Sequence, residues 1–420
     1  MLNLKTNYLP LLIFLLASCS NIQFEQNLNI LSETKAEVET QDTQFESFLA
    51  NQWDEGLKDN PIFASNLGDK RFNTKISSNS SGQFKINKAK EEKSLKELQL
   101  FNIELLNDEN KLNYKLAELS MLNSIERMNF PSYLMRLNQR GGIQSFYETG
   151  DRLVYTSKQD YEDWLTRLNS FVENIDNSLT NNKQGLELGY TQPKLVTRGV
   201  IAQISAIINS DIENHPYLKV FKNADESLMS SNEKTDLINR AKTLISNEIN
   251  PSYKRLHDFL KNEYLSTSRD SIGISDVPNG SKWYEVLSNY HTTTNLSPDE
   301  IHDIGLSEIK RIRSEMEKII SDLEWDGDFN SFLNYLRTSP RFYYDNPEDL
   351  FNAYLIMSKT IDPLLPKIFK TFPRAPYGVI PIPAESAPFT TTAYYNSPSK
   401  GKPGYFYANL YKPESRPKNE

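Results

Sequence analysis

Apolar residues recur at steps of three and four along most of the chain, a spacing typical of helices with one buried face. The pattern predicts helices at about 45–59, 85–128, 158–181, 193–212, 232–262, 282–290, 298–321, 328–337 and 347–361. The range 85–128 fits two helices or one long bent helix, with its leucines on one side and a solvated Lys/Glu face. No internal repeat or change of composition divides the chain, so residues 44–420 are expected to form one mostly helical domain.

The helix expected from Pro298 to Ser321 has the clearest start. Ser297 suits the N-cap, Pro298 the first helical position and Glu300 the third, which together make a capping box. The expected buried stripe of this helix consists of Ile301, Ile304, Ile309, Ile312, Met316 and Ile319 or Ile320.

Helical spacing ends before the last segment, 376–420, which is rich in Tyr, Pro and small polar residues. Two runs in it, 389–395 and 405–411, alternate as strands do, and the turn-rich stretch 396–404 joins them. The protein is therefore expected to be mainly α, a large helical domain with a small β-hairpin or sheet near its C-terminus. Because no closing helix or cap follows the hairpin, the domain is expected to be incomplete at that end.

The composition agrees with a folded protein and argues against two classes. Of the 420 residues, 38% are hydrophobic and 11% aromatic, which is too apolar for a disordered chain. The net charge of −8 and the lack of a basic stripe on any expected helix argue against nucleic-acid binding.

The first residues have the features of a lipoprotein signal. A positive charge at Lys5 precedes an apolar run too short to span a bilayer, and the string LASC, which ends at Cys19, reads as a lipobox. We expect residues 1–18 to be removed, Cys19 to carry the lipid and residues 19–43 to form a flexible tether. The alternative is a plain secretory signal with a chance cysteine.

This signal places the protein in the bacterial cell envelope, anchored through Cys19 and facing the periplasm. Ser20 after the lipidated cysteine favours the outer membrane over the inner one. Cys19 is also the only cysteine of the chain, so no internal disulfide is expected.

No complete catalytic motif stands in the chain. Its four histidines, His215, His257, His291 and His302, lack the one-turn spacing and the H-E-x-x-H string of a helical zinc site. There is no G-x-S-x-G elbow, no phosphate-binding glycine loop and no dinucleotide fingerprint. Acidic pairs are plentiful, but the sequence does not show which of them converge.

A first group of candidate binding residues surrounds His291. Three threonines follow it, Thr292–Thr294, which are too polar for a core and come just before the capped helix. The free N–H groups and positive dipole of a helix start suit a carboxylate or carbonyl, whereas the alternative is a capping loop with a surface histidine. The pair Gly141-Gly142 leaves a similar choice between an anion cradle and a turn.

The C-terminal segment carries a second group. Tyr394, Tyr395 and Tyr407 lie on the two expected strands, and Arg416 follows shortly after them. A tyrosine face is unusual in a core since each hydroxyl needs a partner, so it suits a cleft wall that binds peptide or sugar. The alternative is a structural, half-exposed hairpin.

Several long strings carry a family resemblance. They are GYTQPKLVTRGVIAQI, VPNGSKWY, YHTTTNLSPDEIHDIGLSEIKRIRSEM, PYGVIPIPAESAPFTTTAYY and PGYFYANLYKPESRPKNE. These strings resemble the bacterial family called domain of unknown function 885, many of whose members are secreted lipoproteins. The resemblance runs from about Phe45 to Glu420, and HTTT…EIH and FYANLY…SRPK are specific to it.

The resemblance implies a fold similar to gluzincin zinc peptidases, including the carboxypeptidase-like and angiotensin-converting-enzyme-like groups. In the family, a helix with the string H-E-A-x-P-G-H-H follows the hairpin and supplies zinc ligands and the catalytic glutamate. This sequence ends before such a string, so zinc is expected for the full-length family and none for this chain. The resemblance also implies a peptide cleft, with a strand edge that pairs with substrate and a Tyr or His that stabilises the oxyanion. The residues it places near that cleft are His291, Thr292, Thr293, Tyr394, Tyr395, Tyr407 and Arg416.

The sequence therefore predicts the N-terminal part of a lipoprotein related to zinc-dependent peptidases, inactive by itself in peptide-bond hydrolysis. Its partners would be a peptide substrate or ligand and the membrane, not nucleic acid. One alternative is a non-catalytic peptide- or ligand-binding lipoprotein. Another is an interrupted gene product, which would expose apolar surface where further helices pack.

Overall fold

The computed structural model describes residues 40–139, 141–382, 387, 390–398 and 403–418. The chain divides into two compact units, Met1–Ser297 and Pro298–Glu420. The expected signal peptide, Cys19 and most of the tether lie outside the described residues. The domain boundaries expected from the sequence stay a prediction.

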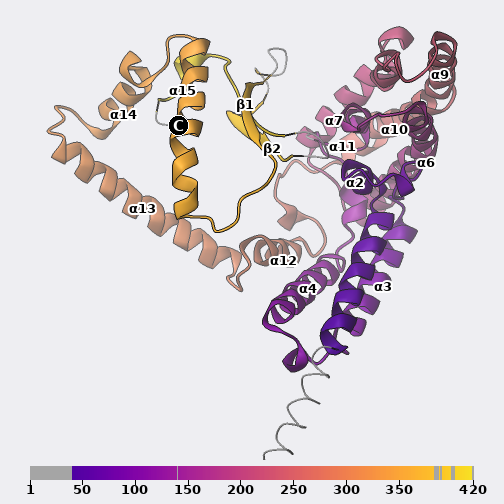
Figure 1. Ribbon diagram of the computed structural model, residues 1–420, viewed down its shortest axis with the longest axis horizontal. Helices are drawn as coiled ribbons and strands as arrows, with labels where there is room; N and C mark the ends of the chain where they lie inside the picture. Colours follow the sequence, from indigo (N-terminus) through magenta and orange to yellow (C-terminus); the bar gives the residue numbers. More distant parts are fainter. Residues whose placement is uncertain (1–39, 140, 383–386, 388–389, 399–402, 419–420) are drawn as a thin grey trace, which may run out of the picture. The chain divides into compact units, whose positions relative to one another are not determined.

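The first unit begins with helices that build a small core. Residues 40–59 are helical, and α2 (Pro61–Asn66), α3 (Ser81–Leu98) and α4 (Asp108–Arg127) follow, with α3 packed against α4 (Figure 1). Of the two alternatives for 85–128, two separate helices is therefore the correct one. The buried residues of this core are Phe45, Leu98, Leu106, Tyr114 and Met121.

The buried face of α4 differs from the one expected. Asn110, Tyr114 and Met121 are buried, and the Asn110 amide donates to Asp42 and Glu46 of the first helix at 2.9 and 3.2 Å. A step of two residues turns a helix by about 200°, so side chains two positions away from this face point outward. Leu112, Leu116 and Leu119, which were expected in the core, are exposed for this reason, and Leu122, one position after Met121, is exposed as well.

A larger core surrounds α6 (Lys158–Leu188), the longest helix among the described residues. It packs against α9 (Ser231–Leu244) and α10 (Asn250–Phe259), and α10 packs in turn against α7 (Lys194–Ile208) (Figure 1). The unit is completed by α5 (Tyr147–Arg152), α8 (Lys219–Lys222), α11 (Leu265–Thr267) and α12 (Gly280–Thr292). The helices expected between residues 158 and 290 are confirmed.

A buried arginine ties the segment between α2 and α3 to α6. Arg167 donates from Nε to the Lys75 carbonyl at 2.8 Å, and from Nη2 to the Phe72 carbonyl at 3.0 Å and Ser65 Oγ at 2.9 Å. Burial lowers the pKa of Arg167 to about 10. The segment can therefore run along α6 with its carbonyls satisfied by a side chain.

In its described residues, the second unit contains three α-helices and a small sheet. Its elements are α13 (Pro298–Asp322), α14 (Phe329–Thr338), α15 (Pro347–Ile361), β1 (Tyr377–Pro381), β2 (Ala393–Asn396) and β3 (Gly404–Ala408). The strand order is β1-β3-β2, with β1 parallel and β2 antiparallel to β3 (Figure 1). The expected hairpin is confirmed, but its strands are shorter than the expected runs 389–395 and 405–411, since β2 begins at Ala393 and β3 ends at Ala408. Strand β1 was missed because it contains Gly378 and Pro381, which are depleted in strands. The fold class, mainly helical with a small sheet near the C-terminus, is also confirmed.

The stripe of α13 is largely exposed, contrary to expectation. Of its residues only Ile320 is buried, and Ile309 is 66% exposed. Within this unit α13 packs against α14, where the Arg313 guanidinium lies 3.3 Å from the Phe329 ring centroid. A periodic stripe marks a face that can be buried, but a partner must be present to bury it. Among the described residues, no helix combines the length and apolar content needed to cross a membrane.

Candidate functional site

His291, Thr292 and Thr293 lie at the end of α12. Thr292 donates its hydroxyl to the Ser288 carbonyl at 2.9 Å, and Thr293 leaves the helix with a positive φ of 54°. His291 is exposed, and its ring lies edge-on to Tyr290 with 4.9 Å between centroids. The C-terminal end of a helix carries partial negative charge, and His291 and Thr292 lie at this end of α12. The dipole of α12 therefore does not favour anion binding by these two residues.

Tyr394 and Tyr407 are opposite each other in β2 and β3. Their rings stack with centroids 4.8 Å apart and planes at 13°, and Tyr405 meets Tyr407 edge-on at 6.4 Å. Phe406, which lies between Tyr405 and Tyr407 in β3, points to the other side of the sheet. Its ring packs against that of Tyr354 in α15, with 5.7 Å between the centroids. Tyr394, Tyr405 and Tyr407 therefore form an aromatic surface on the side of the sheet away from α15, which we call the tyrosine face.

Tyr395 lies on the opposite side of the sheet from the tyrosine face. It pairs with Phe406 in the register of β2 and β3. Its hydroxyl covers Gly404, where an added Cβ atom would collide with it. Tyr395 thus has a packing role in this structure, and the binding role expected for it stays a prediction.

Arg416 reaches the start of β2. Its Nη1 donates to Thr392 Oγ1 at 3.0 Å, two residues before Tyr394. Its Nε is buried and has no hydrogen-bond partner among the described residues. A buried unpaired donor of this kind costs about 1–3 kcal/mol.

The residues expected to share one cleft belong to two different units. The group at the end of α12 lies in the first unit, and the tyrosines with Arg416 lie in the second. Within the second unit the structure brings Tyr394, Tyr407 and Arg416 together around β2. Their combination with His291 in one cleft stays a prediction.

The described residues do not fit a zinc ion. The His215 ring is buried, its Nε2 lies 3.1 Å from Asn250 Oδ1, and burial lowers its pKa. His257 Nδ1 lies 3.1 Å from Asp258 Oδ1. In the part of the chain that the structure describes, no three His, Cys, Asp or Glu side chains come together to hold a metal.

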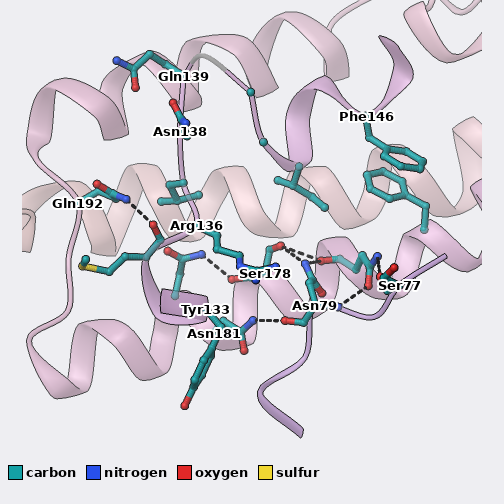
Figure 2. A pocket seen from close by; sticks show the side chains of 18 of the residues that line it. Ser77, Asn79, Tyr133, Arg136, Asn138, Gln139, Phe146, Ser178, Asn181 and Gln192 are labelled. Atoms are coloured by element: carbon teal, nitrogen blue, oxygen red, sulfur yellow. Dashed lines mark hydrogen bonds between the residues drawn. The ribbon is translucent and has the colours of Figure 1, made fainter. Parts of the chain in front are cut away.

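The first unit also contains a cavity of about 740 Å³, seen from close by in Figure 2. It lies where the segment before α3, residues 133–139 and 141–146, and α6 meet. The glycine pair Gly141-Gly142 is part of its lining. This cavity was not expected from the sequence, although a polar row at helical spacing on α6 could have marked it: Asn174, Ser178, Asn181 and Asn182.

Hydrogen bonds hold the polar row of α6 against Asn79. The Asn79 backbone N–H donates to Asn174 Oδ1 at 3.2 Å, and its amide group donates to Ser178 Oγ at 2.9 Å. The Asn181 amide donates to the Asn79 carbonyl at 2.8 Å (Figure 2). Because these amides are engaged with each other and with the backbone, this wall of the cavity is preformed.

Comparison with known families decides the identity of the chain. The family described as "Bacterial protein of unknown function (DUF885)" matches residues 61–420. This chain belongs to that family. The resemblance seen in the sequence strings is thereby confirmed, whereas the similarity to zinc peptidases stays an expectation. A comparison with curated proteins found no match.

Two solved structures share the fold of this DUF885 protein. A candidate lipoprotein from Colwellia psychrerythraea matches with a TM-score of 0.72 and 20% identity, over 91% of this chain and 68% of that one. A candidate lipoprotein of unknown function from Shewanella oneidensis matches with a TM-score of 0.64 and 13% identity, over 88% and 65%. At these identities the similarity shows a common fold, and this chain spans about two thirds of the length of either protein.

Proposed function

We propose that this DUF885 protein binds extended peptides at the bacterial cell envelope. The observation that carries the proposal is the tyrosine face, together with Arg416 at the start of β2. In the strand order β1-β3-β2, β2 is an edge strand, and an edge strand offers backbone N–H and C=O groups to an added strand. A peptide along β2 would place every second side chain on the tyrosine face.

Arg416 and the tyrosines would contribute differently to such binding. The charged guanidinium of Arg416, held at the start of β2 by Thr392, suits a carbonyl or carboxylate of the peptide. Tyr394 is partly exposed, and its ring offers a flat apolar surface to a peptide side chain. The backbone pairing would supply affinity without strong preference for one peptide sequence.

Lipidation at Cys19 would hold this binding protein on the membrane, facing the periplasm, and Ser20 favours the outer membrane. Both similar structures are described as candidate lipoproteins, which supports a lipid anchor on this chain. A Cys19→Ser variant should move from the membrane fraction to the soluble periplasmic fraction. Retention of that variant in the membrane would contradict anchoring through Cys19.

Peptide binding is also the first step of the hydrolysis that the family resemblance implies. In the reaction that the resemblance implies, zinc would supply an activated water. Because the described residues offer no site that fits zinc, we propose that this chain binds peptide without cleaving it. Mass spectrometry of a peptide incubated with the protein and zinc tests this point, and cleaved products would refute it.

Fluorescence anisotropy with the purified mature protein and a fluorescein-labelled alanine–valine hexapeptide tests the binding itself. We expect saturable binding that weakens when alternate backbone nitrogens of the peptide are methylated, because methylation removes strand-to-strand hydrogen bonds. Equal binding of the methylated peptide would exclude strand addition. A hexapeptide that does not bind at all would overturn the proposed function.

A further inference from the structure

We propose that the cavity of the first unit binds a small organic carboxylate with an apolar body, and that Arg136 holds the carboxylate. The cavity is formed within the first unit, so the proposal does not depend on the tyrosine face. Among the described residues that line it, Arg136 is the only charged one. Its volume of about 740 Å³ is typical of sites for small molecules.

The charge of Arg136 is not compensated by the described residues. The side chain is accessible to solvent and forms no ion pair with any of them, while the protein atoms around it lower its pKa by desolvation. Arg136 also lines a second hollow, which contains four carboxylates. Each of these already has another partner: Glu55 and Asp59 with Lys90, Glu91 with Ser124, and Glu97 with Lys93. A guanidinium left unpaired among protein atoms is a good site for an anion.

A carboxylate fits this site better than a phosphate does. One guanidinium forms two parallel N–H···O bonds with one carboxylate and neutralises its single charge. A phosphate group carries more negative charge, and the described lining offers no second cation to balance it. The charge of the cavity therefore selects a monoanion.

The rest of the lining favours a ligand whose body is apolar. Phe146 lies at one side of the cavity (Figure 2) and stacks on Phe171 with 4.1 Å between the ring centroids. Phe171, Ile76 and Ile143 also line the cavity. Tyr133 forms no side-chain hydrogen bond with another described residue and can donate to one further polar group of the ligand. Asn174, Ser178 and Asn181 are already bonded to Asn79, so these three shape the wall without requiring ligand partners.

Isothermal titration calorimetry with three probes tests the proposal: N-acetyl-L-phenylalanine, N-acetyl-L-leucine and octanoate. At least one should bind, and the neutral amide of that probe should bind about tenfold more weakly, because it loses the charge-assisted pair with Arg136. The Arg136→Gln variant should bind the acid about tenfold more weakly than the wild-type protein does. Arg136→Lys should retain part of the affinity because it keeps the charge. Arg198→Gln is the matched control, since Arg198 is exposed and does not line the cavity.

Three outcomes would overturn the assignment. They are equal binding of acid and amide, unchanged affinity in Arg136→Gln, and no binding of any of the three carboxylates at millimolar concentration. Arg136 has no ion-pair partner to lose among the described residues, so its variants should melt at the temperature of the wild-type protein, which circular dichroism can verify. The bound carboxylate should not displace the labelled hexapeptide, and this separates the cavity from the proposed peptide site.

Discussion

The rings of Tyr394 and Tyr407 lie nearly parallel across β2 and β3, with 4.8 Å between their centroids and 13° between their planes. Tyr394 is 36% exposed, so one side of its ring rests on Tyr407 while part of it stays open to solvent. Burial of the rest raises the pKa of its hydroxyl, which therefore remains protonated and available as a donor. A ring held in place by its neighbour can bind a peptide side chain without losing much rotamer freedom.

Replacing Tyr394 by alanine tests this arrangement. An aromatic pair contributes about 0.5–1.5 kcal/mol beyond its buried area, and with the lost contact area we expect about a tenfold fall in hexapeptide affinity. Tyr394→Phe keeps the ring and should bind within about threefold of the wild-type protein. Anisotropy titrations measure both, and an alanine variant with full affinity would remove the tyrosine face from the site.

Gly404→Ala tests the assignment of Tyr395 to the other side of the sheet. The new methyl group would collide with the Tyr395 hydroxyl, which must move, so we expect a loss of about 1 kcal/mol in the free energy of unfolding. Because Tyr395 is not part of the tyrosine face, peptide affinity should stay within about threefold. Urea unfolding measures the free energy of unfolding. The double variant Gly404→Ala with Tyr395→Ala should regain part of the stability lost in Gly404→Ala. A double variant less stable than either single one would show that this contact is not the cause.

Arg167→Met should be strongly destabilising. The methionine can fill most of the volume, but it leaves the Lys75 carbonyl without its side-chain donor, and the Phe72 carbonyl keeps only the Lys75 N–H. An unpaired group of this kind costs about 1–3 kcal/mol when it is shielded from solvent, so we expect a loss in that range in the free energy of unfolding. Arg167→Lys keeps a donor, so its free energy of unfolding should lie between those of the methionine variant and the wild-type protein. A methionine variant as stable as the wild type would mean that solvent reaches these carbonyls.

Asp160 should make the first unit sensitive to acid. Its carboxylate accepts from Lys70 at 2.7 Å and from the Thr156 backbone at 2.8 Å. Burial alone would raise the pKa of Asp160, but these hydrogen bonds outweigh it and lower the pKa below its usual value. A lowered pKa gives stability that is present above the unfolded value of about 3.9 and is lost as the pH falls through the folded value.

The change from pH 5 to pH 3 should therefore lower the urea midpoint of the wild-type protein more than that of Asp160→Asn. The asparagine cannot gain a proton, so its variant should be less stable at neutral pH and change less with acid. Identical pH profiles of the two proteins would exclude Asp160 as a source of the acid sensitivity.

The two faces of α4 provide a matched pair of substitutions. Met121 is buried in the small core, so Met121→Ala should reduce the free energy of unfolding by about 2–3 kcal/mol. Leu116, five residues earlier, is exposed, so Leu116→Ala should change the free energy of unfolding by less than about 0.5 kcal/mol. Chemical unfolding of both variants checks the orientation of the helix, and the reverse order of losses would show that the leucine face is the buried one.

Helix α4 shows where a local sequence pattern stops predicting burial. Two interleaved sets of positions on this helix have helical spacing, and the more apolar set, the leucines, was the natural choice for a core. The structure buries the other set because Asn110 finds Asp42 and Glu46 on the helix at 40–59, an association that no local pattern encodes. Similarly, the isoleucines of α13 have the spacing of a buried stripe but little in the described part of their unit to pack against.

By itself, the sequence determined the helices, the C-terminal hairpin and membership of the DUF885 family, because these follow from local spacing and from contiguous strings of residues. Only the tertiary structure decided that Tyr394 stacks on Tyr407 while Tyr395 covers Gly404, since the register of β2 and β3 assigns each residue to a side. It also decided that Arg136 lines one cavity together with Asn79 and α6. Such a site depends on distant segments that pack together, and the identity of those segments is a property of the whole fold.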